Sequence, residues 1–226
     1  MNILAFDTST DNLGIALKND RGTYSFTLCE ALRHSEKLLP LAELVLDAAG
    51  TKISEIDLLV CAKGPGSFTG LRIGMSTVKG MAFALSVPVV SVPTLDFLAS
   101  GYNYFDGAVI PVLDAKKNRF YTAVYDEGIR KSDYLDADCR EIAVITKNYK
   151  KVLLTGPDSI KLYMQLKDSA VIDLKNIFTD DASNKSRIIN CLELGHEMYK
   201  NGNIDSDDSG PVYIRKSDAE ENSASE

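Results

Sequence analysis

The order of apolar and polar residues in the first fifty positions predicts three strands followed by a helix. Residues 3–6, 13–17 and 23–29 are apolar or alternating runs, and the polar segments DTSTDN and KNDRG join them. Successive strands joined by such turns form an antiparallel meander. Residues 34–49 then carry an apolar arc of helical period, and Gly50 suits the position just after a helix end. Ser35 is a candidate N-cap for this helix.

A second group of elements surrounds a glycine-rich segment. Residues 57–62 form a short apolar run that enters the turn KGPG, residues 67–86 have helical character, and residues 87–92 predict another strand. The helical stretch has only two charges, Arg72 and Lys79. Gly70 and Gly74 lie one helical turn apart, so another backbone could approach the helix there.

The second half of the chain repeats this pattern. LAFD at residues 4–7 corresponds to PVLD at residues 111–114, and each is followed by a polar turn and a further strand, here residues 119–125. A strand over 151–155, a helix over 159–166, a strand over 170–173 and a helix over 183–199 complete the second unit. The prediction is a first subdomain at residues 1–103, a smaller second one at 104–216 and a disordered acidic tail at 217–226.

Composition limits the function more than it changes the fold. The 226 residues are 45% hydrophobic and carry a net charge of −7, so no overall basic field attracts nucleic acid. From Asp205 onward there are seven acidic residues against two basic ones. The four cysteines form no CxxC pair, and neither a signal peptide nor a membrane-spanning run is evident. We expect a cytoplasmic protein with reduced cysteines.

The segment GPGSFTGLRIG, which starts at Gly64, is the most unusual stretch. It fits neither the Walker pattern nor the GxGxxG fingerprint. A strand, a glycine turn and a helix start nevertheless bring several backbone N–H groups to a place where an anion could sit, although the turn could equally serve packing alone. Asp7 and Asp114 end their strands and could hold a metal-bound phosphate through water, or could cap their own turns. The candidate nucleotide or phosphate contacts are Asp7, Thr8, Ser9, Gly64, Gly66, Ser67 and Asp114.

Motifs for hydrolysis are lacking in the sequence. The chain has two histidines, His34 and His196, and contains neither HExxH nor GxSxG. No catalytic residue and no metal ligand is therefore predicted.

Four segments resemble a known family. MNILAFDTST, HSEKLLP, GPGSFTGLRIG and PVLDAKKNRFYTAVYD occur in the order found in the bacterial TsaB (YeaZ) proteins, and PVYIRK resembles their C-terminal end. The resemblance implies an α/β fold with the duplicated, actin-like architecture of the Hsp70 and sugar-kinase superfamily, built from two RNase H-like subdomains of βββαβα type. It also implies a part in making threonylcarbamoyladenosine beside the anticodon of tRNAs that read codons starting with A.

By this resemblance the chain is a non-catalytic partner of TsaD, the paralogue that transfers the threonylcarbamoyl group and holds a metal through a histidine pair. That pair is missing from this sequence, where residues 75–84 contain no histidine. The resemblance further implies contact with TsaE homologues, with tRNA mainly through the complex, and with no membrane. The isolated chain would need no cofactor, with ATP or ADP a candidate ligand at the partner interface.

The two helices over 34–49 and 67–86 have more apolar surface than one sheet can cover, which is typical of an interface. We expect them to pack against TsaD, or against a second copy when the protein is alone. The expected interface residues are Leu38, Leu41, Val45, Gly70, Gly74, Val78 and Met81. The alternative is an independent ATPase or kinase-like enzyme that uses the candidate phosphate contacts. Glycoprotease-type hydrolysis has little support, because no residue pair supplies a nucleophile and its base.

Overall fold

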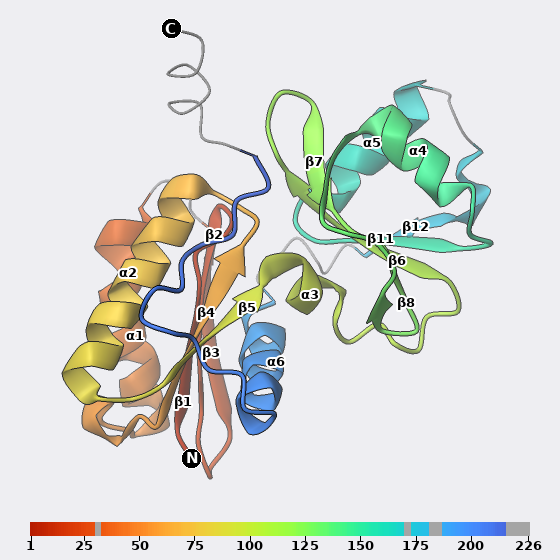
Figure 1. Ribbon diagram of the computed structural model, residues 1–226. Helices are drawn as coiled ribbons and strands as arrows, with labels where there is room; N and C mark the ends of the chain where they lie inside the picture. Colours follow the sequence, from red (N-terminus) through yellow and green to blue (C-terminus); the bar gives the residue numbers. More distant parts are fainter. Residues whose placement is uncertain (30–32, 170–172, 181–186, 216–226) are drawn as a thin grey trace, which may run out of the picture.

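The computed structural model describes residues 1–29, 33–169, 173–180 and 187–215. Two β-sheets lie side by side, each covered by helices (Figure 1). We call the first sheet with α1, α2 and α6 the first lobe, and the second sheet with α4 and α5 the second lobe. The mixed α/β layout with two sheets is the duplicated architecture that the sequence predicted.

The first sheet contains β1 (Ile3–Asp7), β2 (Asn12–Lys18), β3 (Thr23–Cys29), β4 (Leu58–Gly64) and β5 (Val89–Pro93). Its strand order is β3-β2-β1-β4-β5. The first three strands pair antiparallel, whereas β4 pairs parallel with β1 and β5. The predicted meander is confirmed, and β1 ends at Asp7 in the centre of the sheet.

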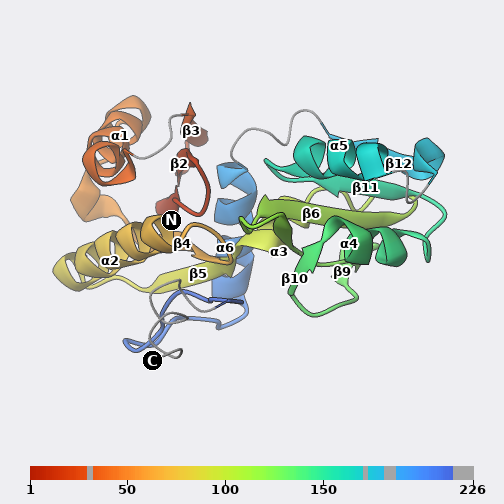
Figure 2. The same cartoon turned by 90° about the horizontal axis from the view of Figure 1, so that it is seen from above.

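Helices cover both faces of this sheet. Leu4 and Phe6 of β1 pack with α1 (His34–Ala49) and α2 (Phe68–Leu85), whereas the alternate residues Ile3 and Ala5 pack with α6 (Ile188–Lys200). Figure 2 shows α1 and α2 on one side of the sheet and α6 on the other, toward the second lobe. Every residue of β1 is buried, because helices cover the sheet on both sides.

The ends of α1 and α2 follow from local chemistry. Gly50 ends α1 in the left-handed conformation, with its N–H on the carbonyl of Asp47. Ser67 caps α2, and its Oγ accepts from the Gly70 N–H at 3.2 Å. The expectation that Ser35 caps α1 is wrong, because the helix already begins at His34. The His34 Nε2 atom lies 2.7 Å from the carbonyl of Thr10, and this contact ties the helix start to the β1–β2 turn.

The second sheet repeats the first. It contains β6 (Ala108–Asp114), β7 (Arg119–Thr122), β10 (Leu135–Asp138), β11 (Val152–Thr155) and β12 (Ile177–Thr179), in the order β10-β7-β6-β11-β12. The sheet also holds the short strands β8 (Tyr125–Asp126) and β9 (Ile129–Arg130), which pair off this path beside β6. When these two are left out, the order in both sheets is third, second, first, fourth and fifth along the lobe. The predicted repeat is therefore confirmed at the level of topology, with β6 and Asp114 in the places of β1 and Asp7.

Several short elements depart from the sequence prediction. The strand expected over 119–125 is divided between β7 and β8 (Tyr125–Asp126), and β8 pairs with β9 (Ile129–Arg130). The sequence did not predict five other elements. These are the helices α3 (Thr94–Ala99) and α4 (Cys139–Thr146), the strand β12 and the 3-10 turns at Ile53–Glu55 and Leu174–Asn176. The second-lobe helix α5 (Ser159–Ser169) was expected, and it packs with α4 on one apolar cluster.

The last helix does not belong to the second lobe. The sequence placed a helix over 183–199 in the second unit, but α6 packs on β1, β2, β4 and β5 of the first sheet. The reason lies in Ile188, Cys191 and Leu192, which fill the face of that sheet left open by α1 and α2. The chain thus crosses to the second lobe at α3 and returns at α6, so the expected subdomain over 104–216 is not continuous. Of the strand expected over 170–173, residues 170–172 lie outside the described residues, as does the predicted tail at 217–226.

Candidate functional site

A cleft of about 420 Å³ lies between the lobes, where β1 and β6 end. The β1–β2 turn and the glycine-rich turn line it from the first lobe, and the β6–β7 turn, Asp158 and Arg215 line it as well. Of the predicted phosphate contacts, Ser9, Gly66, Ser67 and Asp114 line this cleft, whereas Asp7, Thr8 and Gly64 do not. The duplicated fold thus brings the two repeated turns to opposite walls of one cleft.

Asp7 serves its own turn. Its carboxylate is 2% exposed, and Oδ1 accepts from the Ser9 N–H at 3.0 Å and from the Ser9 Oγ at 2.6 Å. This is the Asx-type cap that short polar side chains form in turns. Of the two roles weighed for Asp7, the structure shows the cap.

The glycine-rich turn packs tightly against the same β1–β2 turn. A Cβ on Gly66 would collide with the Ser9 carbonyl, and one on Gly70 would collide with the Thr8 carbonyl. The Ser67 N–H donates to the Ser9 carbonyl at 2.7 Å, and the Gly70 N–H is taken by the helix cap. Two of the N–H groups that could have met an anion therefore already have partners.

Asp114 has a different environment from Asp7, its counterpart in the repeat. Its Oδ2 accepts from Lys161 Nζ at 2.8 Å and from Lys116 Nζ at 3.4 Å, and its N–H donates to Asp158 Oδ2 at 2.8 Å. Burial raises the pKa of Asp114. The hydrogen bond from Lys161 and the contacts with Lys116 together lower this pKa by more than burial raises it, so the net shift is downward. Burial is the main cause that raises the pKa of Asp158. The pKa values of the two carboxyl groups at this wall are therefore shifted in opposite directions.

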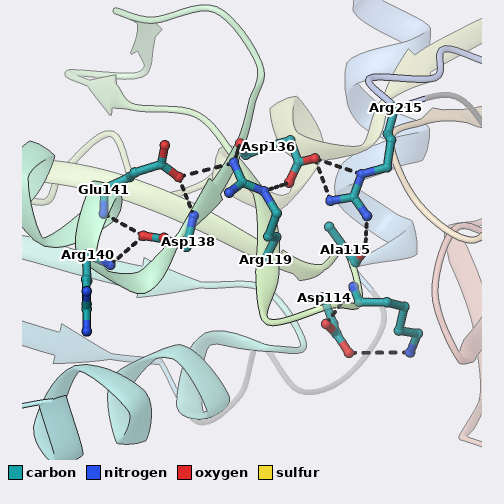
Figure 3. A network of polar contacts seen from close by, with 9 residues as sticks. Asp114, Ala115, Arg119, Asp136, Asp138, Arg140, Glu141 and Arg215 are labelled. Carbon is teal, nitrogen blue, oxygen red and sulfur yellow. Dashed lines mark hydrogen bonds and ion pairs between the residues drawn. The ribbon is translucent and has the colours of Figure 1, made fainter.

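A network of ion pairs borders the cleft on the second lobe (Figure 3). Asp136 of β10 accepts from Arg119 Nε at 2.9 Å and from Arg215 Nη2 at 2.6 Å. Arg119 also reaches Glu141 at 3.1 Å. Sequence reasoning missed Asp136, Asp158, Lys161 and Arg215, because each is distant along the chain from the residue it contacts.

Comparison with known proteins agrees with this geometry. The family model described as "TsaD: tRNA N6-adenosine threonylcarbamoyltransferase" matches residues 30–222. The chain belongs to the TsaD family, in its TsaB (YeaZ) branch. It is 29% identical over 233 residues to the tRNA threonylcarbamoyladenosine biosynthesis protein TsaB of Bacillus subtilis, covering 97% of this chain and 96% of that one. It is 39% identical over 129 residues to TsaB of Escherichia coli, covering 55% of each.

Solved structures agree with the fold of this branch. YeaZ from Pseudomonas aeruginosa superposes with a TM-score of 0.76 at 24% identity, covering 94% of this chain and 99% of that one. A Bacteroides thetaiotaomicron protein described as having an actin-like ATPase fold matches with a TM-score of 0.50 at 11% identity, covering 85% of this chain and 95% of that one. The actin-like fold expected from the TsaB resemblance is thereby confirmed.

The residues that the sequence placed at a TsaD interface lie mostly in the core. Leu38, Val45, Gly70, Gly74 and Val78 are buried, and Leu41 and Met81 are half-buried. The glycines admit the β1–β2 turn of the same chain, because a Cβ on Gly70 or Gly74 would collide with Thr8. The close approach that Gly70 and Gly74 allow is thus used by the chain's own turn, and their contact with a partner helix stays a prediction. Periodicity identified the apolar arc of each helix but not which part of it faces the sheet.

Other apolar side chains of the same two helices are exposed. Leu39 and Leu44 of α1 are 53% and 49% exposed, and Phe83 of α2 is 89% exposed. These three residues define what we call the α1–α2 surface. Large exposed apolar side chains on two neighbouring helices are typical of an interaction surface.

Two kinds of feature are absent from the part of the chain that the structure describes. Within residues 1–29, 33–169, 173–180 and 187–215, no group of three or more His, Cys, Asp or Glu residues is placed to hold a metal ion. In the same ranges no helix is both long enough and apolar enough to cross a bilayer.

Proposed function

We propose that the chain is a non-catalytic subunit of the machinery that forms threonylcarbamoyladenosine on tRNA, where it binds and supports TsaD. Membership of the TsaB branch supports this role, because a relative that matches 97% of the chain and another that matches 55% of it are both named for that biosynthesis. The transfer would then take place on TsaD, at the adenosine beside the anticodon.

The positions of the two histidines are the observation that supports a non-catalytic role. The resemblance implies that TsaD holds its metal through a histidine pair, and this chain has two histidines in all. His34 lies at the start of α1 against the Thr10 carbonyl, and His196 lies on α6 on the opposite face of the first sheet. They cannot form such a pair in this fold.

The α1–α2 surface is the proposed contact for TsaD. Phe83 is its most exposed large apolar residue, and exposed aromatic anchors carry much of the affinity at protein interfaces. The same surface would join two copies when TsaD is absent, since a two-fold pairing uses one patch on both subunits. A TsaE homologue and tRNA would be reached through the assembled complex rather than by this chain alone.

The test of the interface is the Phe83→Asp variant with the TsaD homologue of the same organism. Loss of an anchor of this kind costs about 2 kcal/mol or more, so we expect at least about a thirtyfold loss of affinity in a pull-down or calorimetric titration. Val144→Asp is the matched control, because Val144 is an apolar residue of α4 that is 62% exposed on the other lobe. Equal binding by both variants would refute the proposed surface.

The functional proposal has a separate test. Deleting the gene should abolish threonylcarbamoyladenosine in bulk tRNA, as measured by mass spectrometry of nucleosides. A deletion strain that keeps full modification would refute the assignment whatever the surface does. In reconstitution, the isolated chain should show no transfer, and activity should need TsaD.

The chain is not proposed to need a cofactor of its own, and ATP or ADP at the TsaD interface remains a prediction. Calorimetric titration with magnesium and ATP should show tight binding only in the complex. Tight binding by the isolated chain would favour the independent ATPase, which is otherwise less supported than the TsaB role. Asp7, which that alternative needs at a phosphate, is engaged with Ser9.

A further inference from the structure

The segment after α6 runs as an extended strap along the first lobe (Figure 1). We call residues 203–215 the strap. The Asp205 N–H donates to the Val89 carbonyl at 2.9 Å, and the Val212 N–H donates to the Lys63 carbonyl at 2.8 Å. Lys79 of α2 donates to the Asp207 carbonyl at 2.6 Å. Backbone contacts along its length therefore fix the strap to β4, β5 and α2.

The end of the strap is anchored beside the cleft. The ring of Tyr213 stacks on Phe68, the first residue of α2, with centroids 4.5 Å apart and planes at 11°. Arg72 Nε donates to the Tyr213 hydroxyl at 3.0 Å. Because Phe68 lines the cleft, Tyr213 holds the next residues of the strap at the cleft wall.

Two residues further on, the strap crosses to the other lobe. Arg215 donates to Asp136 Oδ2 from Nε at 2.9 Å and from Nη2 at 2.6 Å, and to the Ala115 carbonyl from Nη1 at 3.2 Å (Figure 3). Arg215 and Asp136 are 17% and 18% exposed. Both donors meet the same oxygen of Asp136, whose other oxygen accepts from Arg119, and a charge-assisted hydrogen bond shielded from solvent is stronger than a neutral one.

The lobes also meet near α3, in a part of the molecule that does not line the cleft. Asp96 of α3 accepts from the hydroxyls of Tyr125 at 2.5 Å and Tyr134 at 2.8 Å, and the guanidinium of Arg130 lies 4.1 Å from the Tyr134 ring centre. These contacts fix the lobes where the chain first crosses between them. At the cleft itself, Arg215 spans from one lobe to the other.

We infer that the strap is a latch, and that the Arg215–Asp136 pair closes the lobes over the cleft. The strap remains bound to the first lobe through Val212 and Tyr213, so breaking this pair frees the second lobe to swing about α3. Access to the cleft is then set by the strength of one ion pair. This device operates in the isolated chain and does not depend on the role proposed above.

The test follows opening with a thiol placed inside the cleft. Leu113 lines the cleft and is 3% exposed, and no hydrogen bond given above joins it to Arg215, so Leu113→Cys gives a reporter that a maleimide reaches when the lobes part. Peptide mass spectrometry reads this thiol separately from the natural cysteines. Arg215→Ala in the reporter background should raise the labelling rate about tenfold, the effect expected from losing a hydrogen-bonded charge pair. Arg140→Ala, which removes an exposed arginine from α4, is the matched control and should leave the rate unchanged.

The variant should remain folded, because Asp136 keeps its contact with Arg119 when Arg215 is removed. Higher salt should speed labelling of the reporter protein and leave the Arg215→Ala form unaffected, since salt screens the pair.

Amide hydrogen exchange gives a second measurement that needs no reporter thiol. Arg215→Ala should speed exchange of the Ala115 N–H, which donates to Arg119 at the cleft wall, and leave the Val212 N–H protected. An unchanged labelling rate in Arg215→Ala, or faster exchange at Val212 with none at Ala115, would overturn the latch. In that case Arg215 would do no more than tether the strap.

Discussion

Gly70 provides the sharpest test of how the glycine-rich turn is built. A Cβ at this position would collide with the Thr8 carbonyl, a backbone atom that cannot rotate away, whereas a Cβ on Gly80 of the same helix would meet nothing within 4 Å. Alanine at Gly80 should stabilise the protein by about 1 kcal/mol, because it gains helix propensity without a clash. Alanine at Gly70 gains at most the same amount and adds an overpacking cost of about 1–3 kcal/mol.

The difference between the two variants therefore isolates the overpacking cost. For a chain of this size, a gap of about 2 kcal/mol corresponds to about 4–8 °C in melting temperature. Thermal unfolding followed by circular dichroism measures it. Equal melting temperatures for Gly70→Ala and Gly80→Ala would refute the close packing against Thr8. A Gly70→Ala protein that keeps its stability but loses binding to a TsaD homologue would support the interface role that the sequence first indicated.

Three further predictions follow from burial and charge. Asp158→Asn should be more stable than the natural protein at neutral pH, and this advantage should vanish at acid pH in a pH series of chemical denaturation. Burial raises the pKa of Asp158 in the folded state, so the protonated side chain stabilises the fold at acid pH and this stabilisation is lost as the pH rises. Asp168→Asn, on the exposed side of α5, is the control. Leu38→Ala should cost about 2–5 kcal/mol of unfolding free energy, because Leu38 is 1% exposed, whereas Leu39→Ala should change it by about 0.5 kcal/mol or less. Burial raises the pKa of the Cys61 thiol to about 12, so in the folded protein a maleimide should label the exposed Cys29 and leave Cys61 unmodified until urea unfolds the chain.

The elements best predicted from the sequence are those in which local signals agree with packing. The helix expected over residues 34–49 is α1 at its full length, because its apolar arc and its terminal Gly50 agree with the packing, although the Ser35 cap expected at its start was wrong. The repeat was readable for the same reason, since LAFD and PVLD each combine a buried strand with a polar turn. Short elements such as α3 and β12 have too few residues to show a period.

The sequence could not show which element of the structure each apolar helix face packs against. The apolar residues of α6 have helical spacing wherever the helix packs, and only the open face of the first sheet determines that it returns there. The same limit explains the interface prediction, in which Leu38 and Val78 were expected to face TsaD and instead face β1. It also explains the missed contacts of Asp114 with Lys161 and of Asp136 with Arg215, which join residues far apart in the chain.

The two halves of the repeat share a topology, but the aspartates that end their first strands have different partners. Asp7 is buried and engaged with a hydroxyl and an N–H of its own turn, whereas Asp114 is held by two lysines at the rim of the cleft. Here one carboxylate is committed to the fold and the other to lysines, while large apolar side chains are exposed on the outer side of α1 and α2. The protein has the actin-like fold, and the large apolar side chains exposed on two of its helices are typical of a protein-binding surface.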